Sequence, residues 1–150
     1  MRSGQENARP LEIAPIVAQI ADKIQAKEML FYNGPREFFE DFHPSHSMEI
    51  EAYTDSIIGA ARALPCELVV CVNYLHQVGM LRIHDVLDEL KRVTQGVGFF
   101  HIETDHEIED ANSIDQPVEW WIAEFVRRFA LQTFQRVPGG FYVIVYPRMH

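Results

Sequence analysis

Residues 67–73 read Glu-Leu-Val-Val-Cys-Val-Asn, a nearly unbroken apolar run in which valine recurs. Such a run is typical of a strand buried on both faces of a parallel sheet. Residues 80–93 then carry apolar side chains at helical spacing with charged side chains on the opposite face, which predicts an amphipathic helix. Gly96 and Gly98 are expected to end the helix, and residues 98–103 predict a second buried strand.

Two buried strands joined by an amphipathic helix form a βαβ unit, whose strands run parallel through a right-handed crossover. In sheets of this kind, ligands bind beyond the carboxyl ends of the strands. We therefore expect functional residues within 73–79 and 101–106.

The rest of the sequence predicts elements on both sides of this unit. Before it we expect a helix at 10–27 with Pro15 in its first turn, a strand at 28–32, a brief helix at 36–42, an edge strand at 48–53 and a short helix at 56–64. After it we expect a polar loop at 104–115, a helix at 117–129 capped by Asp115, and strands at 131–137 and 141–146 around the turn at 138–140.

Composition narrows the classes of protein that this chain can be. The length of 150 residues fits one domain, and we expect residues 1–9 to be flexible. The net charge of −9 argues against a general nucleic-acid binder. The chain has neither an apolar run of membrane-spanning length nor the hydrophobic core of a signal peptide, and it has two cysteines, Cys66 and Cys71. We expect a cytoplasmic protein with reduced thiols.

The order of elements, closing on a hairpin, resembles the class I S-adenosylmethionine-dependent methyltransferase fold. The best local match is Leu-Val-Val-Cys-Val-Asn-Tyr-Leu-His-Gln-Val-Gly at 68–79, followed by Val-Leu-Asp-Glu-Leu-Lys-Arg-Val-Thr at 86–94. These correspond to the family's fourth strand, its loop and the next helix. Gln-Pro-Val-Glu-Trp-Trp at 116–121 resembles a segment of small methyltransferase-like proteins of bacteria and phages.

The resemblance implies an α/β fold, a minimal Rossmann-like three-layer sandwich. Its sheet would hold about six strands in the family order 2-1-4-5-7-6, with strand 7 antiparallel. The third strand would be missing, because residues 54–66 are too few for a helix, a strand and a second helix.

The resemblance also places S-adenosylmethionine against three loops. Its cofactor-binding residues would be Tyr32, Asn33, Gly34, Tyr53, Thr54, Asp55 and Asn73. Several family features are altered here. The first loop keeps one glycine, Phe31 replaces its acid, and Pro35 removes a backbone donor. We therefore expect S-adenosylmethionine to bind weakly, in a pocket partly filled by Phe31, Tyr32 or Tyr53.

The resemblance places catalysis in the loop that begins at residue 73. Asn73, Tyr74 and His76 lie where the family places groups near the methyl donor and acceptor, and His76 could act as a base. His101, Glu103 and Asp105 share a strand face but would span ~13 Å, too far to bind one metal ion. We expect no metal.

Two hypotheses of different classes remain. The chain is a divergent methyltransferase whose acceptor is a small molecule or a protein, or it is a catalytically inactive relative that keeps the fold as a binding or regulatory module.

Overall fold

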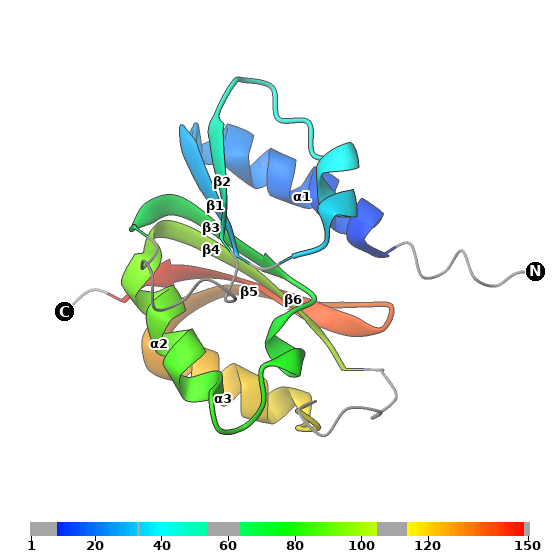
Figure 1. Cartoon of the computed structure of the whole chain (residues 1–150), viewed down its shortest axis with the longest axis vertical. Coiled ribbons are helices and arrows are strands. Elements are labelled where there is room, and N and C mark those ends of the chain that lie inside the picture. Colours follow the sequence, from blue (N-terminus) through cyan, green and yellow to red (C-terminus); the bar gives the residue numbers. More distant parts are fainter. Residues whose placement is uncertain (1–8, 33, 54–63, 105–113, 149–150) are drawn as a thin grey trace, which may run out of the picture.

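A computed structural model describes residues 9–32, 34–53, 64–104 and 114–148, without the side chains of residues 9–12 and 53. Its centre is a six-stranded sheet in the order β2-β1-β3-β4-β6-β5 (Figure 1). The strands are β1 (Glu28–Tyr32), β2 (Glu49–Tyr53), β3 (Cys66–Val72), β4 (Thr94–Glu103), β5 (Phe129–Val137) and β6 (Gly140–Pro147). Strands β1 to β4 pair in parallel, whereas β6 is antiparallel to both β4 and β5. In the family's numbering this order is 2-1-4-5-7-6, so the expected topology is confirmed.

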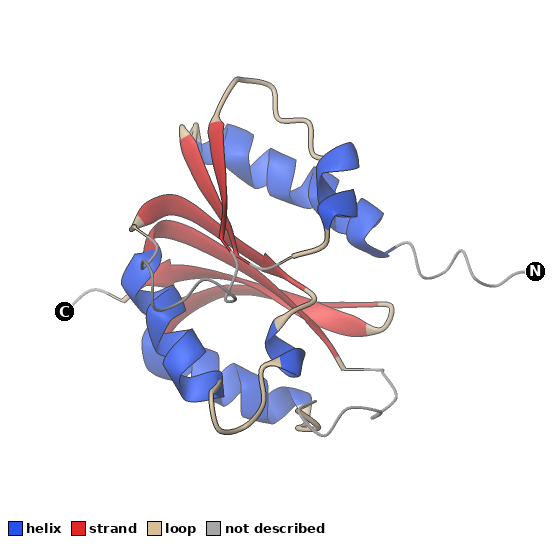
Figure 2. Cartoon of the chain, in the orientation of Figure 1, coloured by secondary structure: helices blue, strands red, loops and turns tan. Residues whose placement is uncertain are grey.

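Helices cover both faces of the sheet and complete a three-layer sandwich (Figure 2). The helix α1 (Arg9–Ile24) and the 3₁₀ turn η2 (Arg36–Glu40) lie on one face. The helices α2 (Ile83–Val93) and α3 (Val118–Arg128) lie on the other. A second 3₁₀ turn, η4 (Leu75–Gln77), follows β3. No helix among the described residues is long and apolar enough to cross a membrane.

The continuous apolar pattern of β3 arises because both of its faces are buried. Val69 and Cys71 pack in the core formed with α2 and α3, whereas Leu68, Val70 and Val72 pack in the core formed with α1. Strand side chains alternate between faces, so a strand covered on both sides needs apolar residues at every position.

Three local expectations were wrong. Pro15 lies inside α1 rather than in its first turn, on the exposed side of the helix. Pro117, not Asp115, occupies the N-cap position of α3, and no side chain caps that helix. Gly96 lies within β4 rather than between the helix and the strand, because α2 ends at Val93 and the strand begins at the next residue.

A bulge explains why β4 needs a glycine near its start. The register between β3 and β4 shifts between the pairs Cys66–Thr94 and Leu68–Val97. A Cβ atom on Gly96 would lie 2.6 Å from the carbonyl oxygen of Glu67. Glycine permits this close approach of two backbones.

The ends of the two long helices also differ from the expected bounds. The helix expected at 10–27 ends at Ile24, where Gln25 takes a left-handed conformation with φ 53° and the N–H of Ala26 bonds to the carbonyl of Ala21. The helix expected at 80–93 begins at Ile83. Most of the helix expected at 56–64 and most of the loop expected at 104–115 lie outside the described residues, and Leu64 is not helical.

Candidate functional site

The carboxyl ends of β1, β3 and β4 meet at one edge of the sheet, because the three strands are parallel neighbours. Strand β1 ends at Tyr32, and β3 ends at Val72, just before η4. This edge is where an α/β sheet offers its ligand site. We refer to it as the carboxyl edge.

Asn73 is the first residue beyond β3 and turns the chain sharply. Its φ of 57° lies in the left-handed region, which asparagine tolerates better than most residues. Its backbone N–H donates to the carbonyl of His101 at 3.0 Å, and its own carbonyl accepts from Nε2 of Gln77 at 3.1 Å. Its side-chain Oδ1 is buried and has no hydrogen-bond partner among the described residues. Asn73 therefore fixes the loop through its backbone and leaves a buried acceptor in the site.

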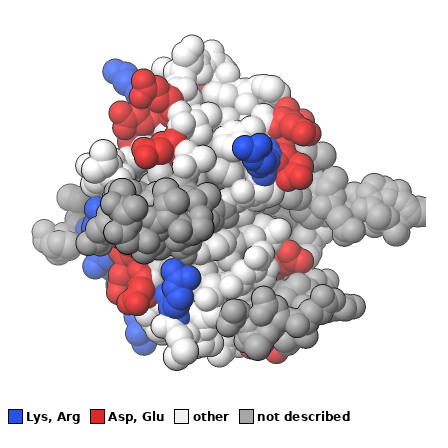
Figure 3. Space-filling view, in the orientation of Figure 1, with Lys and Arg blue, Asp and Glu red and all other residues white. Residues whose placement is uncertain are grey.

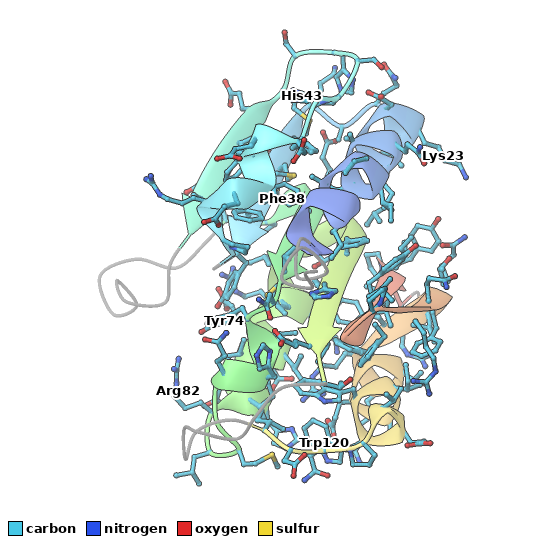
Figure 4. The ribbon with its side chains drawn as sticks, turned by 90° about the vertical axis from the view of Figure 1, so that its right-hand side faces the viewer. Lys23, Phe38, His43, Tyr74, Arg82 and Trp120 are labelled. Atoms are coloured by element: carbon cyan, nitrogen blue, oxygen red, sulfur yellow. The ribbon has the colours of Figure 1, made fainter. Side chains whose placement is uncertain are left out.

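Tyr74 and His76 belong to the turn that follows. His76 is 5% exposed and its carbonyl accepts from the N–H of Ile114 at 2.7 Å, so it is a buried histidine. The ring of Tyr74 lies 6.2 Å from that of Tyr32 at the end of β1. In Figure 4, Tyr74 lies between Phe38 and Arg82. The structure thus brings Tyr32, Asn73, Tyr74 and His76 together at the carboxyl edge.

His101 also lies at the carboxyl edge, within the predicted functional range 101–106. The side chain lies in β4, is 4% exposed, and neither ring nitrogen has a hydrogen-bond partner among the described residues. Burial, with a smaller contribution from the charge on His76, lowers the pKa of His101 to about 4. Its imidazole is therefore neutral at pH 7. The available signal was a histidine inside an otherwise apolar strand, which the sequence-based interpretation weighed only as a metal ligand.

Metal binding has no support within the part of the chain that the structure describes. No group of three or more His, Cys, Asp or Glu side chains there could hold a metal ion. Asp105, one of the three residues weighed as ligands, lies outside the described residues.

The first loop is packed by aromatic side chains rather than open. Phe31 is buried, with its ring stacked on Phe38 at 4.8 Å and edge-on to Phe39 at 4.6 Å. A Cβ atom built on Gly34 would lie 2.3 Å from Cζ of Phe31, so the loop backbone rests directly on that ring. Tyr32 is fully buried as well.

The remaining expected cofactor residues are only partly placed. Tyr53 pairs with Tyr32 at the end of β2, but its side chain lies outside the described residues. Asn33, Thr54 and Asp55 also lie outside them.

These observations test how well the carboxyl edge fits S-adenosylmethionine. The buried Oδ1 of Asn73 suits a donor on a ligand, and the neighbouring His76 suits a reacting group. The space above Gly34, which a glycine-rich loop would leave to the cofactor, is taken by Phe31. The residues fit the reacting end of the site and contribute little at the first loop.

A second polar cluster, Asp22, Ser45 and His46, has the composition of a hydrolase triad but not its geometry. Oγ of Ser45 donates to Oδ2 of Asp22 at 2.8 Å, not to the histidine. Nδ1 of His46 lies 3.1 Å from Oδ1 of Asp22, and its Nε2 donates to the carbonyl of Ala26 at 2.6 Å. Since Nε2 is occupied, His46 cannot activate Ser45. The cluster ties the loop at 43–47 to the end of α1.

Comparison with known proteins gives structural likeness without sequence likeness. No protein-family model matches the sequence, and no curated protein is significantly similar to it. An O-methyltransferase family protein from Burkholderia thailandensis superposes with a TM-score of 0.70 at 9% identity, over 91% of this chain and 55% of that one. The CurJ carbon methyltransferase gives 0.69 at 8% identity, over 93% and 54%.

A smaller protein matches over nearly its whole length. The N-methyltransferase NodS from Bradyrhizobium japonicum, solved with S-adenosyl-L-homocysteine, gives a TM-score of 0.62 at 9% identity, over 97% of this chain and 91% of that one. The present chain spans about half the length of the first two structures. The acceptors named for these proteins differ, whereas the architecture is shared. The chain therefore has the class I methyltransferase fold, with six strands and three α-helices among the described residues.

Proposed function

We propose that this chain is a divergent S-adenosylmethionine-dependent methyltransferase that acts at the carboxyl edge. The observation that carries the proposal is the buried position of His76, directly after β3 and beside Asn73 and Tyr74. The fold supports it, since structures with the same architecture are methyltransferases, two of them solved with the demethylated cofactor.

The chemistry asked of the protein is modest. S-adenosylmethionine supplies an electrophilic methyl group, and the protein must hold the acceptor in line and remove a proton where the acceptor carries one. His76 would take that proton, because an imidazole can act as a general base and this one lies at the edge where ligands bind. Oδ1 of Asn73 would accept a hydrogen bond from the bound molecules.

Surface charge favours a small or basic acceptor over nucleic acid. On the face in Figure 3, Asp and Glu side chains form several patches, with Lys and Arg scattered among them. The chain carries 22 acidic and 13 basic residues. Such a surface repels the phosphate backbone.

The test has two parts. Calorimetric titration with S-adenosylmethionine and S-adenosylhomocysteine measures cofactor binding directly. Incubation with methyl-labelled cofactor and a low-molecular-weight metabolite extract then measures transfer, which we expect to fall ~100-fold or more in His76→Gln, the scale of general-base catalysis. The matched control is His84→Gln, because His84 is half-exposed on α2. Absence of binding at millimolar cofactor would overturn the proposal and leave the fold as a binding module.

A further inference from the structure

We propose that His101 is a specificity-determining residue of the carboxyl edge, where it hydrogen-bonds an uncharged group that both donates and accepts, such as an amide. The inference rests on the proposed function in one respect: it assigns this uncharged group to the methyl acceptor.

The burial of His101 without partners is the first support. Both ring nitrogens are buried and neither has a hydrogen-bond partner among the described residues. Folded proteins rarely leave such atoms unsatisfied, because burial removes their hydrogen bonds with water without replacing them. His101 shares its face of the sheet with Phe99 and, on the paired strands, with Val72 and Tyr142, whose side chains are buried. A polar ring among them without a protein partner indicates a role toward a bound molecule.

Its position is the second support. The carbonyl of His101 accepts from the N–H of Asn73, so the two residues lie on adjacent strand ends. The charge on His76 reaches His101 and lowers its pKa, which places the two imidazoles within electrostatic range. His101 therefore belongs to the same edge as the proposed base.

The chemistry of the ring selects the ligand group. A neutral imidazole offers one donor and one acceptor. A carboxylate only accepts, and an ammonium only donates, so either would leave one nitrogen unsatisfied. An amide does both. Aromatic side chains border the position, since Tyr142 pairs with His101 across β4 and β6 and its ring lies 4.8 Å from that of Phe99. An aromatic amide combines a donor and an acceptor with a ring that can pack against these aromatic side chains.

The experiment uses three probes that share a benzene ring. Benzamide donates and accepts, benzoate is its anionic counterpart of the same shape, and toluene is apolar. The full chain is labelled with ¹⁵N-histidine and titrated with each probe while the ring nitrogens of His101 are followed by NMR. We expect benzamide to shift them saturably and to bind about tenfold more tightly than toluene or benzoate, the scale of one hydrogen bond. If benzamide leaves them unmoved, or all three probes bind alike, the proposal is overturned and ordered water is the partner of the ring.

Variants separate this role from a structural one. His101→Phe should reduce the preference for benzamide over toluene to less than about threefold, without loss of thermal stability, because it removes two buried polar atoms that lack a protein partner. His101→Gln keeps a donor and an acceptor and should retain the preference. His43→Phe is the matched control, since His43 is exposed and far from Tyr74 (Figure 4). A preference that persists in His101→Phe would overturn the proposal. The probes need no cofactor, so a chain that fails to bind S-adenosylmethionine can still pass this test.

Discussion

The backbone N–H of Asn73 donates a hydrogen bond to the carbonyl oxygen of His101 at 3.0 Å, just beyond the last paired residue of β3. This bond holds the loop that carries Tyr74 and His76 against the adjacent strand. Asn73 itself takes the left-handed conformation, with φ 57°, which turns the chain from the end of β3 toward η4. The position of the proposed base therefore depends on the backbone of the residue three places before it.

Substitution of Asn73 should separate its conformational role from its side-chain role. Asn73→Gly keeps the left-handed turn and should change the free energy of unfolding by less than ~1 kcal/mol. Asn73→Val should cost ~1–3 kcal/mol, because a β-branched residue is strained in that region. Urea unfolding measures both. Equal stability of the two variants would show that the turn is not strained by a side chain.

The sequence predicted the topology well and the site incompletely, for identifiable physical reasons. The apolar run at 67–73 and the helical period after it define a parallel βαβ unit, and few strand orders accommodate it. Periodicity carries no information on which backbones come into contact, so the bulge at Gly96 was missed. His101 lies within the predicted functional range 101–106, but the sequence assigned it no role other than metal ligation, because its other role depends on its neighbour in space, Asn73, which follows a different strand.

The buried ion pair between Glu124 and Arg128 lies within α3, at i,i+4 spacing, and breaking it should destabilise the folded chain strongly. Nη1 of Arg128 lies 3.0 Å from Oε1 of Glu124, and the two residues are 8% and 6% exposed. Arg128→Ala leaves the buried carboxylate of Glu124 with only Nδ1 of His84 among the described residues, 3.5 Å from its Oε1, and should cost ~3–5 kcal/mol in urea unfolding.

A matched control lies on the other side of the same guanidinium. Nε of Arg128 lies 2.8 Å from Oδ1 of Asp88, whose side chain is 65% exposed. Asp88→Ala should cost no more than ~1 kcal/mol, because solvent screens exposed pairs. A cost for Asp88→Ala equal to that for Arg128→Ala would mean that burial is not what makes the pair with Glu124 strong.

Stability should fall as the pH is lowered from about 6.5 toward 4, and His101 should account for part of the fall. Its pKa is 6.5 in an ordinary setting and about 4 in the folded chain. Between these values the unfolded chain binds a proton that the folded chain excludes, so acidification favours unfolding by at most ~1.4 kcal/mol per pH unit for this group.

The contribution of His101 can be isolated by difference. Urea unfolding of the wild type and His101→Phe at about pH 7, 6 and 5 gives the free-energy difference at each pH. As the pH falls, the wild type should lose more free energy of unfolding than the variant does, because the variant has no histidine at position 101 to be protonated. A difference that stays constant would show that His101 is protonated in the folded chain as readily as in the unfolded one.

The affinity for the cofactor should be weak. The affinity that is left should depend on Asp55, which follows β2. Phe31 occupies the space above Gly34, and Pro35 offers no N–H, so the first loop can donate few hydrogen bonds. We expect S-adenosylhomocysteine to bind with a dissociation constant of tens of micromolar or weaker by calorimetry. Asp55 follows β2 by two positions in the sequence, and we propose it as the acid that binds the ribose hydroxyls. Asp55→Ala should weaken binding a further tenfold to hundredfold, since a hydrogen bond to a charged group contributes ~1.5–3 kcal/mol. Glu51→Ala, at an exposed position within β2, is the control and should leave affinity unchanged.

Two outcomes would contradict this prediction. Submicromolar binding by the wild type would show that the aromatic packing at Phe31 does not limit the site. An unchanged affinity in Asp55→Ala would place the ribose elsewhere.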